Sequence, residues 1–454
     1  MKLRRLQLLN FRCFKELLVE FDPKLTIIIA ENGGGKTAIL DAVAIGLGRY
    51  ISKLPGVTGR STKETDIRLN KDQKPERYLM MQWEANTEKN ENIVWSGGRR
   101  RDSTVNVARL RSELDKREDG AFTHKLKSID KYTANLLELE ENQEQYYLPV
   151  IAYYGTNRAI REEVHRRRNF RKQFSRFDAL SNALDSESKF KSAFEWFNAM
   201  EDAERRTKES RRDFDYRLPE LQLVREAIER IMPDGFSNPR TEIRPLRFVI
   251  DRTTNTQTTQ TLRISQLSDG YKVVLGLVMD LARRMAQANS WTLNKTNPIS
   301  PLDLPAIVLI DEVDLHLHPE WQQRIISDLT RTFPETQFII TTHSPQVLST
   351  VKREHIRVIS HDSNEESTAT IPLAMTYGEH SGDVLQSVMH VDPQPPVKER
   401  GDLQKLTEIV DTGGYKTKKS QALMKQLTIS LGEQHPQLQK LQRSIKRQEA
   451  LSKQ

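Results

Sequence analysis

The segment at residues 30–37, with the sequence AENGGGKT, constrains the fold of this chain more than any other feature. It follows an apolar run at residues 25–29 and precedes a helix-like stretch at residues 38–47. A glycine-rich loop in this position suits a phosphate, because glycines let backbone N–H groups converge on the anion and the helix N-terminus adds its positive end. The segment therefore predicts an α/β fold with a phosphate-binding P-loop, although Ala30 stands where the usual pattern has its first glycine.

The residues of this loop have expected roles. We expect the Lys36 ammonium to reach the β- and γ-phosphates of ATP, and the Thr37 hydroxyl to bind Mg²⁺. The ATP-binding residues predicted in this segment are Gly33, Gly34, Gly35, Lys36, Thr37 and Ala38.

A second motif, AIVLIDE at residues 306–312, places two carboxylates directly after five apolar residues. Such a run predicts a buried strand that delivers its acids to the carboxyl edge of a sheet, where α/β proteins bind ligands. We expect Asp311 to hold Mg²⁺ and Glu312 to orient and deprotonate the attacking water. Many acidic strand ends are merely solvated, and it is the pairing with a P-loop that favours the catalytic interpretation.

Composition excludes several classes of protein. No apolar run approaches the roughly 20 residues that a membrane-spanning helix requires. The single cysteine, Cys13, excludes an intramolecular disulfide and a cysteine-based zinc site. The chain begins with a pattern of apolar and basic residues that lacks a signal-peptide core, so we expect a cytoplasmic protein.

Basic residues outnumber acidic ones by 70 to 62, and some of the excess is concentrated at residues 161–176. That segment has seven Arg or Lys residues, two Glu residues and two interleaved Phe residues, a composition that suits contacts to nucleic-acid phosphates. A solvated, charge-rich helix face is the alternative. The candidate DNA-binding residues are Arg166, Arg167, Arg168, Arg171 and Lys172.

Two further motifs narrow the class of ATPase. LSDGYK at residues 267–272 opens a long helix, and Thr341-Thr342-His343-Ser344 follows an apolar strand. The order P-loop, LSDG, DE and THS resembles the ABC ATPase superfamily, specifically its SMC, RecF and OLD-like branch. The segment NFRCF at residues 10–14 is similar to the first strand of that branch.

This resemblance implies an ATPase head with a mixed sheet, a short helical insertion and a C-terminal helical tail. It also implies that Ser268 and Gly270 contact the γ-phosphate held by an opposite subunit, so that hydrolysis requires a homodimer. His343 would sense the same phosphate, and Arg12 and Asn32 resemble residues that reach it. The equivalent of the glutamine loop is not evident, and Asn157 and Arg158 are the nearest candidates.

Two other patterns resemble functional sites, but a purely structural role is favoured for each. Ser96-Gly97-Gly98 imitates a signature motif, but we expect it to form a turn. His316 and His318 alternate as metal ligands do, yet they resemble the ordinary sequence that follows the DE motif in this branch.

The C-terminal region narrows the family further. The segments at residues 377–381 (YGEHS), 388–392 (VMHVD) and 148–158 (LPVIAYYGTNR) are similar to the PtuA-type ATPases of the Septu anti-phage system and to their retron-associated relatives. That family pairs the ATPase with a small HNH endonuclease, PtuB, and its ATP-bound dimers associate into larger assemblies that present DNA. The resemblance implies that this chain regulates cutting and is not itself the nuclease.

Four segments are expected. Residues 1–157 would form an N-terminal lobe, residues 158–240 a helical insertion, residues 241–375 a C-terminal lobe, and residues 376–454 a tail for partner docking or oligomerisation. Two other functions stay open: a RecF-like clamp that binds DNA in an ATP-dependent way, and a scaffold with negligible hydrolysis.

Overall fold

A computed structural model describes residues 1–107, 110, 127–158, 174–186, 190–254, 257–362 and 365–451. The chain divides into two compact units, Met1–Val384 and Leu385–Gln454. The four segments expected from the sequence stay a prediction. Within the described residues, no helix is both long enough and apolar enough to cross a membrane.

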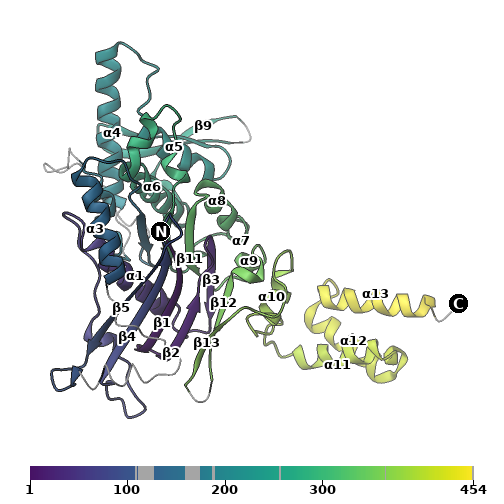
Figure 1. Ribbon diagram of the computed structural model, residues 1–454. Coiled ribbons are helices and arrows are strands. Elements are labelled where there is room, and N and C mark those ends of the chain that lie inside the picture. The colour runs from purple at the N-terminus through teal and green to yellow at the C-terminus, as the bar shows by residue number, and fades with distance from the viewer. Residues whose placement is uncertain are drawn as a thin grey trace. The chain divides into compact units, whose positions relative to one another are not determined.

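The first unit is built on a six-stranded sheet with the order β13-β12-β3-β11-β10-β6. Figure 1 labels the strands β13, β12, β3 and β11 of this sheet. The strands β3, β6, β10, β11 and β12 run parallel, and β13 pairs antiparallel with β12. The mixed sheet confirms the α/β fold class. The bounds are β3 Leu25–Ala30, β6 Val150–Tyr154, β10 Ala306–Ile310, β11 Thr336–Thr341, β12 Ile356–His361 and β13 Ser367–Thr370.

The register of the parallel strands assembles one functional edge. Ile310 of β10 lies between Tyr154 of β6 and Ile340 of β11, and β11 in turn pairs with β3. The residues that follow these strands therefore emerge side by side at the carboxyl edge. β6 and β10 are buried along their whole lengths, which explains their continuous apolar sequences.

A second, four-stranded antiparallel sheet has the order β2-β1-β4-β5. The strands are β1 Lys2–Phe11, β2 Phe14–Glu20, β4 Tyr78–Asn86 and β5 Asn92–Arg100. The turn expected at Ser96-Gly97-Gly98 was wrong, because these residues lie inside β5. Gly97 and Gly98 pair with Met81 and Met80 of β4, and this ladder overrides the turn preference of the two glycines.

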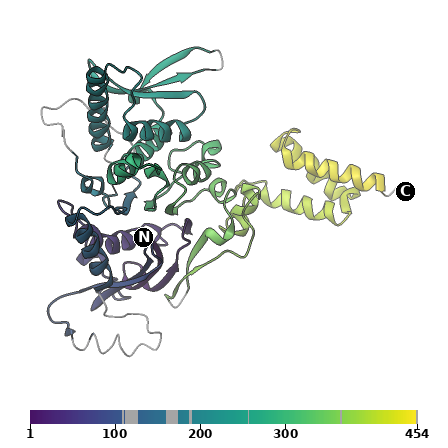
Figure 2. The ribbon, with the colours of Figure 1, turned by 45° about the horizontal axis from the view of Figure 1, so that its top comes forward.

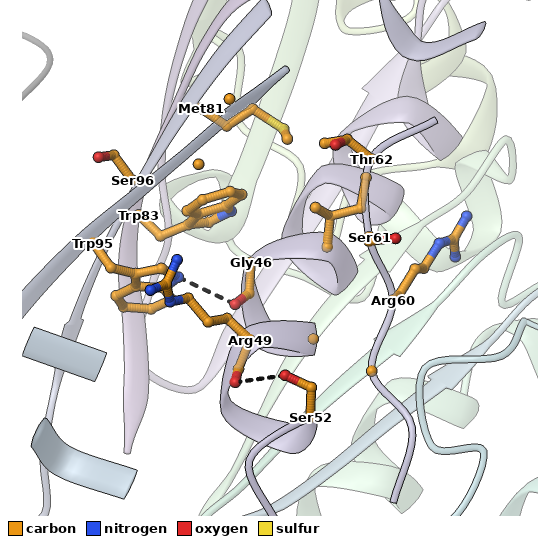
Figure 3. Close-up of a pocket in the computed structure, with 15 residues that line it drawn as sticks. Gly46, Arg49, Ser52, Arg60, Ser61, Thr62, Met81, Trp83, Trp95 and Ser96 are labelled. Carbon is orange, nitrogen blue, oxygen red and sulfur yellow. Dashed lines mark hydrogen bonds between the residues drawn. The ribbon is translucent and has the colours of Figure 1, made fainter. Parts of the chain in front are cut away.

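The helix α1 (Lys36–Ile51) contacts β3 and β11 of the first sheet and β4 of the second, and it is buried along nearly its whole length. Two stacked indoles fix it on the second sheet (Figure 3). Trp83 Nε1 donates to the Ala42 carbonyl at 3.0 Å, and Trp95 Nε1 donates to the Gly46 carbonyl at 3.1 Å. Because α1 begins at Lys36, these contacts also hold the P-loop in place.

Helices and a small sheet complete the first unit. α4, α5 and the antiparallel sheet β7-β8-β9 gather at one end, away from the four-stranded sheet (Figures 1 and 2). The small sheet has the strands β7, β8 and β9 in chain order. The bounds are α3 Lys127–Glu141, α4 Phe190–Arg211, α5 Pro219–Ile231, β7 Phe236–Ile243, β8 Leu246–Thr253, β9 Thr259–Arg263, α6 Asp269–Asn289, α7 Pro319–Gln322, α8 Ile325–Thr332, α9 Pro345–Leu348 and α10 Ser381–Ser387.

A buried ionic network joins α6 to the sheet. The Asp280 carboxylate accepts hydrogen bonds from Arg283 at 2.7 Å, from Arg284 at 2.6 Å and from the Tyr154 hydroxyl at 3.0 Å. Burial alone would raise the pKa of Asp280, but the two guanidinium groups outweigh it and lower that pKa to about 2. The carboxylate is therefore ionised at neutral pH and balances one of the two buried positive charges.

The second unit contains the helices α11 (Arg400–Asp411), α12 (Lys418–Leu431) and α13 (Pro436–Leu451). They pack around a small apolar core, which explains the spacing of leucines along each helix. Its buried members are Leu403, Leu406, Val410, Tyr415, Leu427, Leu438 and Leu441.

Candidate nucleotide-binding site

The P-loop lies between β3 and α1, as its sequence context predicts. Gly33 and Gly35 have φ angles of 78° and 86°, in the left-handed region that disfavours residues with a Cβ atom. A Cβ atom on Gly35 would also lie 2.3 Å from Cζ of Phe14 and 2.6 Å from Sγ of Cys13. The two glycines therefore set a tight loop whose N–H groups lead into the N-terminus of α1, an arrangement suited to an anion.

The Lys36 side chain lies along this loop. Its Nζ atom donates to the Ala30 carbonyl at 3.0 Å and to the Glu31 carbonyl at 3.2 Å. Burial lowers the pKa of Lys36, while the Glu312 and Asp311 carboxylates oppose that shift. The ammonium group is thus held between the loop and the acidic edge, where phosphates of a bound nucleotide would lie.

Thr37 and Asp311 come together from opposite ends of the sequence. The Thr37 hydroxyl donates to Asp311 Oδ2 at 2.8 Å, and the Thr341 hydroxyl donates to Asp311 Oδ1 at 2.6 Å. Asp311 is buried. A hydroxyl and a carboxylate side by side are the hard oxygen donors that Mg²⁺ prefers when it also binds nucleotide phosphates, so the residues fit the expected ion.

Glu312 follows with an unusual backbone. Its φ angle is 50°, which is uncommon for a residue that has a side chain. Its amide N–H donates to the Thr341 hydroxyl at 2.7 Å, and the next amide, of Val313, donates to the Thr341 carbonyl at 3.0 Å. The chain therefore turns sharply after β10, and the half-buried Glu312 carboxylate lies near enough to Lys36 to oppose the lowering of that ammonium's pKa by burial.

Arg158, one of the two glutamine-loop candidates from the sequence, lies next to the DE segment. It follows β6 and is almost wholly buried. Its Nη1 atom donates to the Gly155 carbonyl at 3.0 Å and to the Asp311 carbonyl, and its Nη2 atom donates to the Glu312 carbonyl. Burial lowers the pKa of Arg158 to about 10, against the opposing effect of Asp311, so the guanidinium stays charged at neutral pH. Asn157, the other glutamine-loop candidate, is exposed.

His343 follows β11 and is half-buried. Asp314 accepts hydrogen bonds from the Thr342 hydroxyl and, at 3.4 Å, from the His343 amide. The neighbouring Ser344 hydroxyl accepts the Val347 amide at 3.2 Å and so caps α9. These contacts connect the THS segment to the loop that follows Glu312.

Arg12 forms ion pairs with acidic side chains of its own chain. Its guanidinium lies 2.7 Å from Asp41 Oδ2 on α1 and 2.9 Å from Asp66 Oδ1. Burial works against the charge, but the carboxylates outweigh it and raise the pKa of Arg12. Asn32 is exposed at the tip of the P-loop.

The signature residues lie at the start of α6. Ser268 is exposed, and its hydroxyl accepts the Tyr271 amide at 3.5 Å as the N-cap of the helix. Gly270 is buried, and a Cβ atom there would lie 2.6 Å from the His316 carbonyl oxygen. Ser268 and Gly270 line a groove of about 770 Å³ together with His316 and Trp321. The signature thus packs on the loop that follows the DE motif.

Two groups of sequence candidates remain, the basic residues of 161–176 and the histidines after the DE motif. Arg166, Arg167, Arg168, Arg171 and Lys172 lie outside the described residues. Within the part of the chain that the structure describes, no three or more His, Cys, Asp or Glu side chains form a metal cluster, and His316 and His318 are no exception.

The sequence of this chain matches two family models and several known proteins. A family model described as an AAA domain matches residues 5–232, and a second AAA-domain model matches residues 135–349. The chain is 28% identical over 447 residues to the Retron Ec83 probable ATPase of Escherichia coli, which covers 85% of this chain and 76% of that protein.

Two further similarities are more limited. The Septu protein PtuA of Bacillus mycoides (strain KBAB4) is 34% identical over 125 residues, which is 28% of this chain and 16% of that protein. An SMC head crystallised with the C-terminal winged-helix domain of ScpA covers 82% of this chain and 98% of that chain, with 17% identity and a TM-score of 0.43.

The relationship to retron and Septu ATPases, expected from the motifs and the tail, is thereby confirmed, with the PtuA match confined to part of the chain. The first family model spans half of the chain, and its match contains the P-loop. The chain therefore belongs to the AAA-domain family and is an ATPase related to those of retrons and Septu systems.

Proposed function

We propose that this chain is the ATP-hydrolysing regulatory subunit of an anti-phage defence complex, in which an HNH endonuclease partner cuts invading DNA. The observation that carries the hydrolytic part is the 2.8 Å contact between the Thr37 hydroxyl and Asp311, with Lys36 and Glu312 adjacent. The defence context rests on similarity to a retron ATPase over 85% of the chain.

The chain's own residues would divide the chemistry as follows. The P-loop amides and Lys36 bind the phosphates, while Thr37 and Asp311 hold Mg²⁺, which supplies charge neutralisation at the transferred phosphoryl group. Glu312 orients water and accepts its proton. His343 senses the γ-phosphate from the neighbouring strand end.

The active form is a homodimer with composite sites. Ser268 is exposed just before α6, so a nucleotide held by a second copy would contact its hydroxyl there. Contacts made from both copies would give ATP a higher affinity for the closed dimer, which a nucleotide-controlled switch requires. Higher assemblies and DNA contacts, including any through residues 161–176, belong to the same proposal, and so does a cytoplasmic location.

The second unit, Leu385–Gln454, is the proposed docking element for the nuclease or for further copies. Its separate apolar core supports removal of this unit without loss of the ATP site. A chain truncated after Val384 should therefore bind ATP normally but fail to capture the partner. Capture that survives the truncation would contradict the docking role.

The test of the whole proposal is purification of the tagged chain from its native genomic context, with mass spectrometry of the bound proteins. A small HNH protein in near-stoichiometric amount is the expected result. Repair proteins in its place would favour a RecF-like clamp, and the absence of any stable partner would contradict the defence complex.

A further inference from the structure

Hydrogen bonds hold the backbone amides and carbonyls of both Asp311 and Glu312. The Asp311 amide donates to the Tyr154 carbonyl at 2.8 Å, and the Glu312 amide donates to the Thr341 hydroxyl at 2.7 Å. The Asp311 and Glu312 carbonyls both accept from Arg158. The neighbouring strands β6 and β11 thus supply the partners for the amides, and one side chain supplies a donor to both carbonyls.

This fixation has a physical reason. A φ angle of 50° at Glu312 is a sparsely populated conformation for a residue with a side chain, and such conformations persist only where the surroundings over-determine them. The Glu312 carbonyl has a second donor, the Leu315 amide at 2.9 Å, whereas Arg158 is the donor found for the Asp311 carbonyl. Without the guanidinium, the peptide between these two acids keeps the hydrogen bond from its N–H to the Thr341 hydroxyl but loses the one to its carbonyl.

We infer that Arg158 is a positioning residue that holds the Asp311–Glu312 backbone in the conformation that aims the Glu312 carboxylate at the attacking water. This inference rests on the proposed role of Glu312 as the catalytic base. Arg158 donates to the backbone carbonyls of Asp311, Glu312 and Gly155, so it acts on catalysis through the two acids that it positions.

An arginine suits this position better than a lysine. The guanidinium is planar and rigid, and its separate nitrogens can donate to different carbonyls at once. Here Nη1 donates to the backbone carbonyl of Asp311 and Nη2 to that of Glu312. A lysine ammonium is a single flexible donor centre. It retains the charge but does not fix the two carbonyls relative to each other.

Arg357 offers a matched control. Its guanidinium is also buried and also donates to three backbone carbonyls, those of Glu20 at 2.8 Å, Glu354 at 2.7 Å and Ile356 at 3.0 Å. As with Arg158, burial lowers its pKa. Arg357 lies on β12 and has no contact to the DE segment, so its loss reports the purely structural effect of removing such a side chain.

The experiment compares Arg158→Lys, Arg158→Met and Arg357→Met in the full-length protein, with ATP affinity, single-turnover hydrolysis and thermal unfolding measured for each. We expect Arg158→Met to hydrolyse ATP about 10²-fold more slowly, because a small misplacement of a catalytic group has that effect. Its ATP affinity should stay within about threefold of wild type, because the inference gives Arg158 no part in binding ATP. Arg158→Lys, the milder variant, should be about tenfold slower and fold normally.

Arg357→Met should lower thermal stability without a selective loss of the hydrolysis rate. The inference is overturned if the Arg158 variants hydrolyse ATP at the wild-type rate, or if their rate, affinity and stability fall together as in the control. A double variant, Arg158→Lys with Glu312→Gln, supplies an independent readout. It should be no slower than Glu312→Gln alone, since residues that act as a unit are not additive, and an additive loss would contradict the coupling.

Glu312→Gln on its own separates this inference from the proposed function. Wild-type hydrolysis in that variant would refute the base assignment whatever Arg158 does. A Glu312→Gln variant that binds ATP but hydrolyses it much more slowly than wild type, together with Arg158 variants that hydrolyse at the wild-type rate, would overturn the positioning role alone.

Discussion

The substitution Gly35→Ala tests the P-loop geometry most directly, with Gly33→Ala as its matched control. Both glycines have left-handed backbones, with φ angles of 86° and 78°. A Cβ atom on Gly33 meets nothing within 4 Å, whereas one on Gly35 would meet the Phe14 ring at 2.3 Å. The pair therefore differs in packing but shares the same backbone requirement.

The expected magnitudes follow from these two contributions. A left-handed conformation costs a residue with a side chain about 1–2 kcal/mol, and this applies to both variants. Overpacking a filled site costs about 1–3 kcal/mol more, and this applies only to Gly35→Ala. The free energy of unfolding should thus fall by about 1–3 kcal/mol more in Gly35→Ala than in Gly33→Ala.

Urea unfolding of the nucleotide-free protein, followed by tryptophan fluorescence, is the suitable assay. Trp83 and Trp95 donate to the backbone of α1, the helix that begins at this loop, so their signal reports on the lobe concerned. ATP affinity supplies a second readout, and a loop displaced by the same free energy would bind more weakly by about 5- to 150-fold. Equal unfolding free energies and equal affinities in the two variants would refute the packing of Gly35 against β2.

Three other substitutions follow from the contacts of the site and of the core. Lys36→Ala should abolish ATP binding, and titration with a fluorescent nucleotide that still gives wild-type affinity would contradict the P-loop assignment. Thr37→Val keeps the shape but removes the hydroxyl that contacts Asp311, so the Mg²⁺ concentration for half-maximal hydrolysis should rise about tenfold or more. Asp280→Asn leaves two buried guanidinium groups without a counter-charge and should lower stability at pH 7 by about 3–5 kcal/mol. Because the pKa of Asp280 is about 2 in the folded state, below its ordinary 3.8, its contribution is present above pH 4 and is lost between pH 4 and pH 2. Acid unfolding of wild type and variant should therefore converge in that window, and parallel curves would contradict the assignment.

The sequence predicted the parts of the site whose chemistry is local. Lys36 and Thr37 belong to one loop, and Asp311 and Glu312 end an apolar strand, so residue type and spacing suffice. The contact between Thr37 and Asp311 could be predicted on the single assumption that β3 and β10 end at the same carboxyl edge of the sheet.

The parts that the sequence left open or predicted wrongly depend on contacts between distant segments. Nothing near Arg158 in the sequence indicates that its partners lie more than 150 residues away, on the backbone of Asp311 and Glu312. Every residue has a backbone carbonyl, so the sequence does not indicate which carbonyl an arginine binds. The role of a basic residue that follows a strand therefore cannot be read from the sequence alone. The glycines of β5 were misjudged for a related reason, because their ladder with Met80 and Met81 is a tertiary contact.

The close approach of Gly270 to the His316 carbonyl has a consequence for how two copies of this ATPase would communicate. In the proposed dimer, Ser268 would contact the nucleotide of the neighbouring copy, and the helix that follows Ser268 packs against the loop after Asp311 and Glu312 of its own copy. Loading either nucleotide site would then shift the geometry presented to the other, and by linkage the effect is reciprocal. Hydrolysis should accordingly depend on ATP concentration with a Hill coefficient above one, and the enzyme would act as a threshold detector of its nucleotide supply.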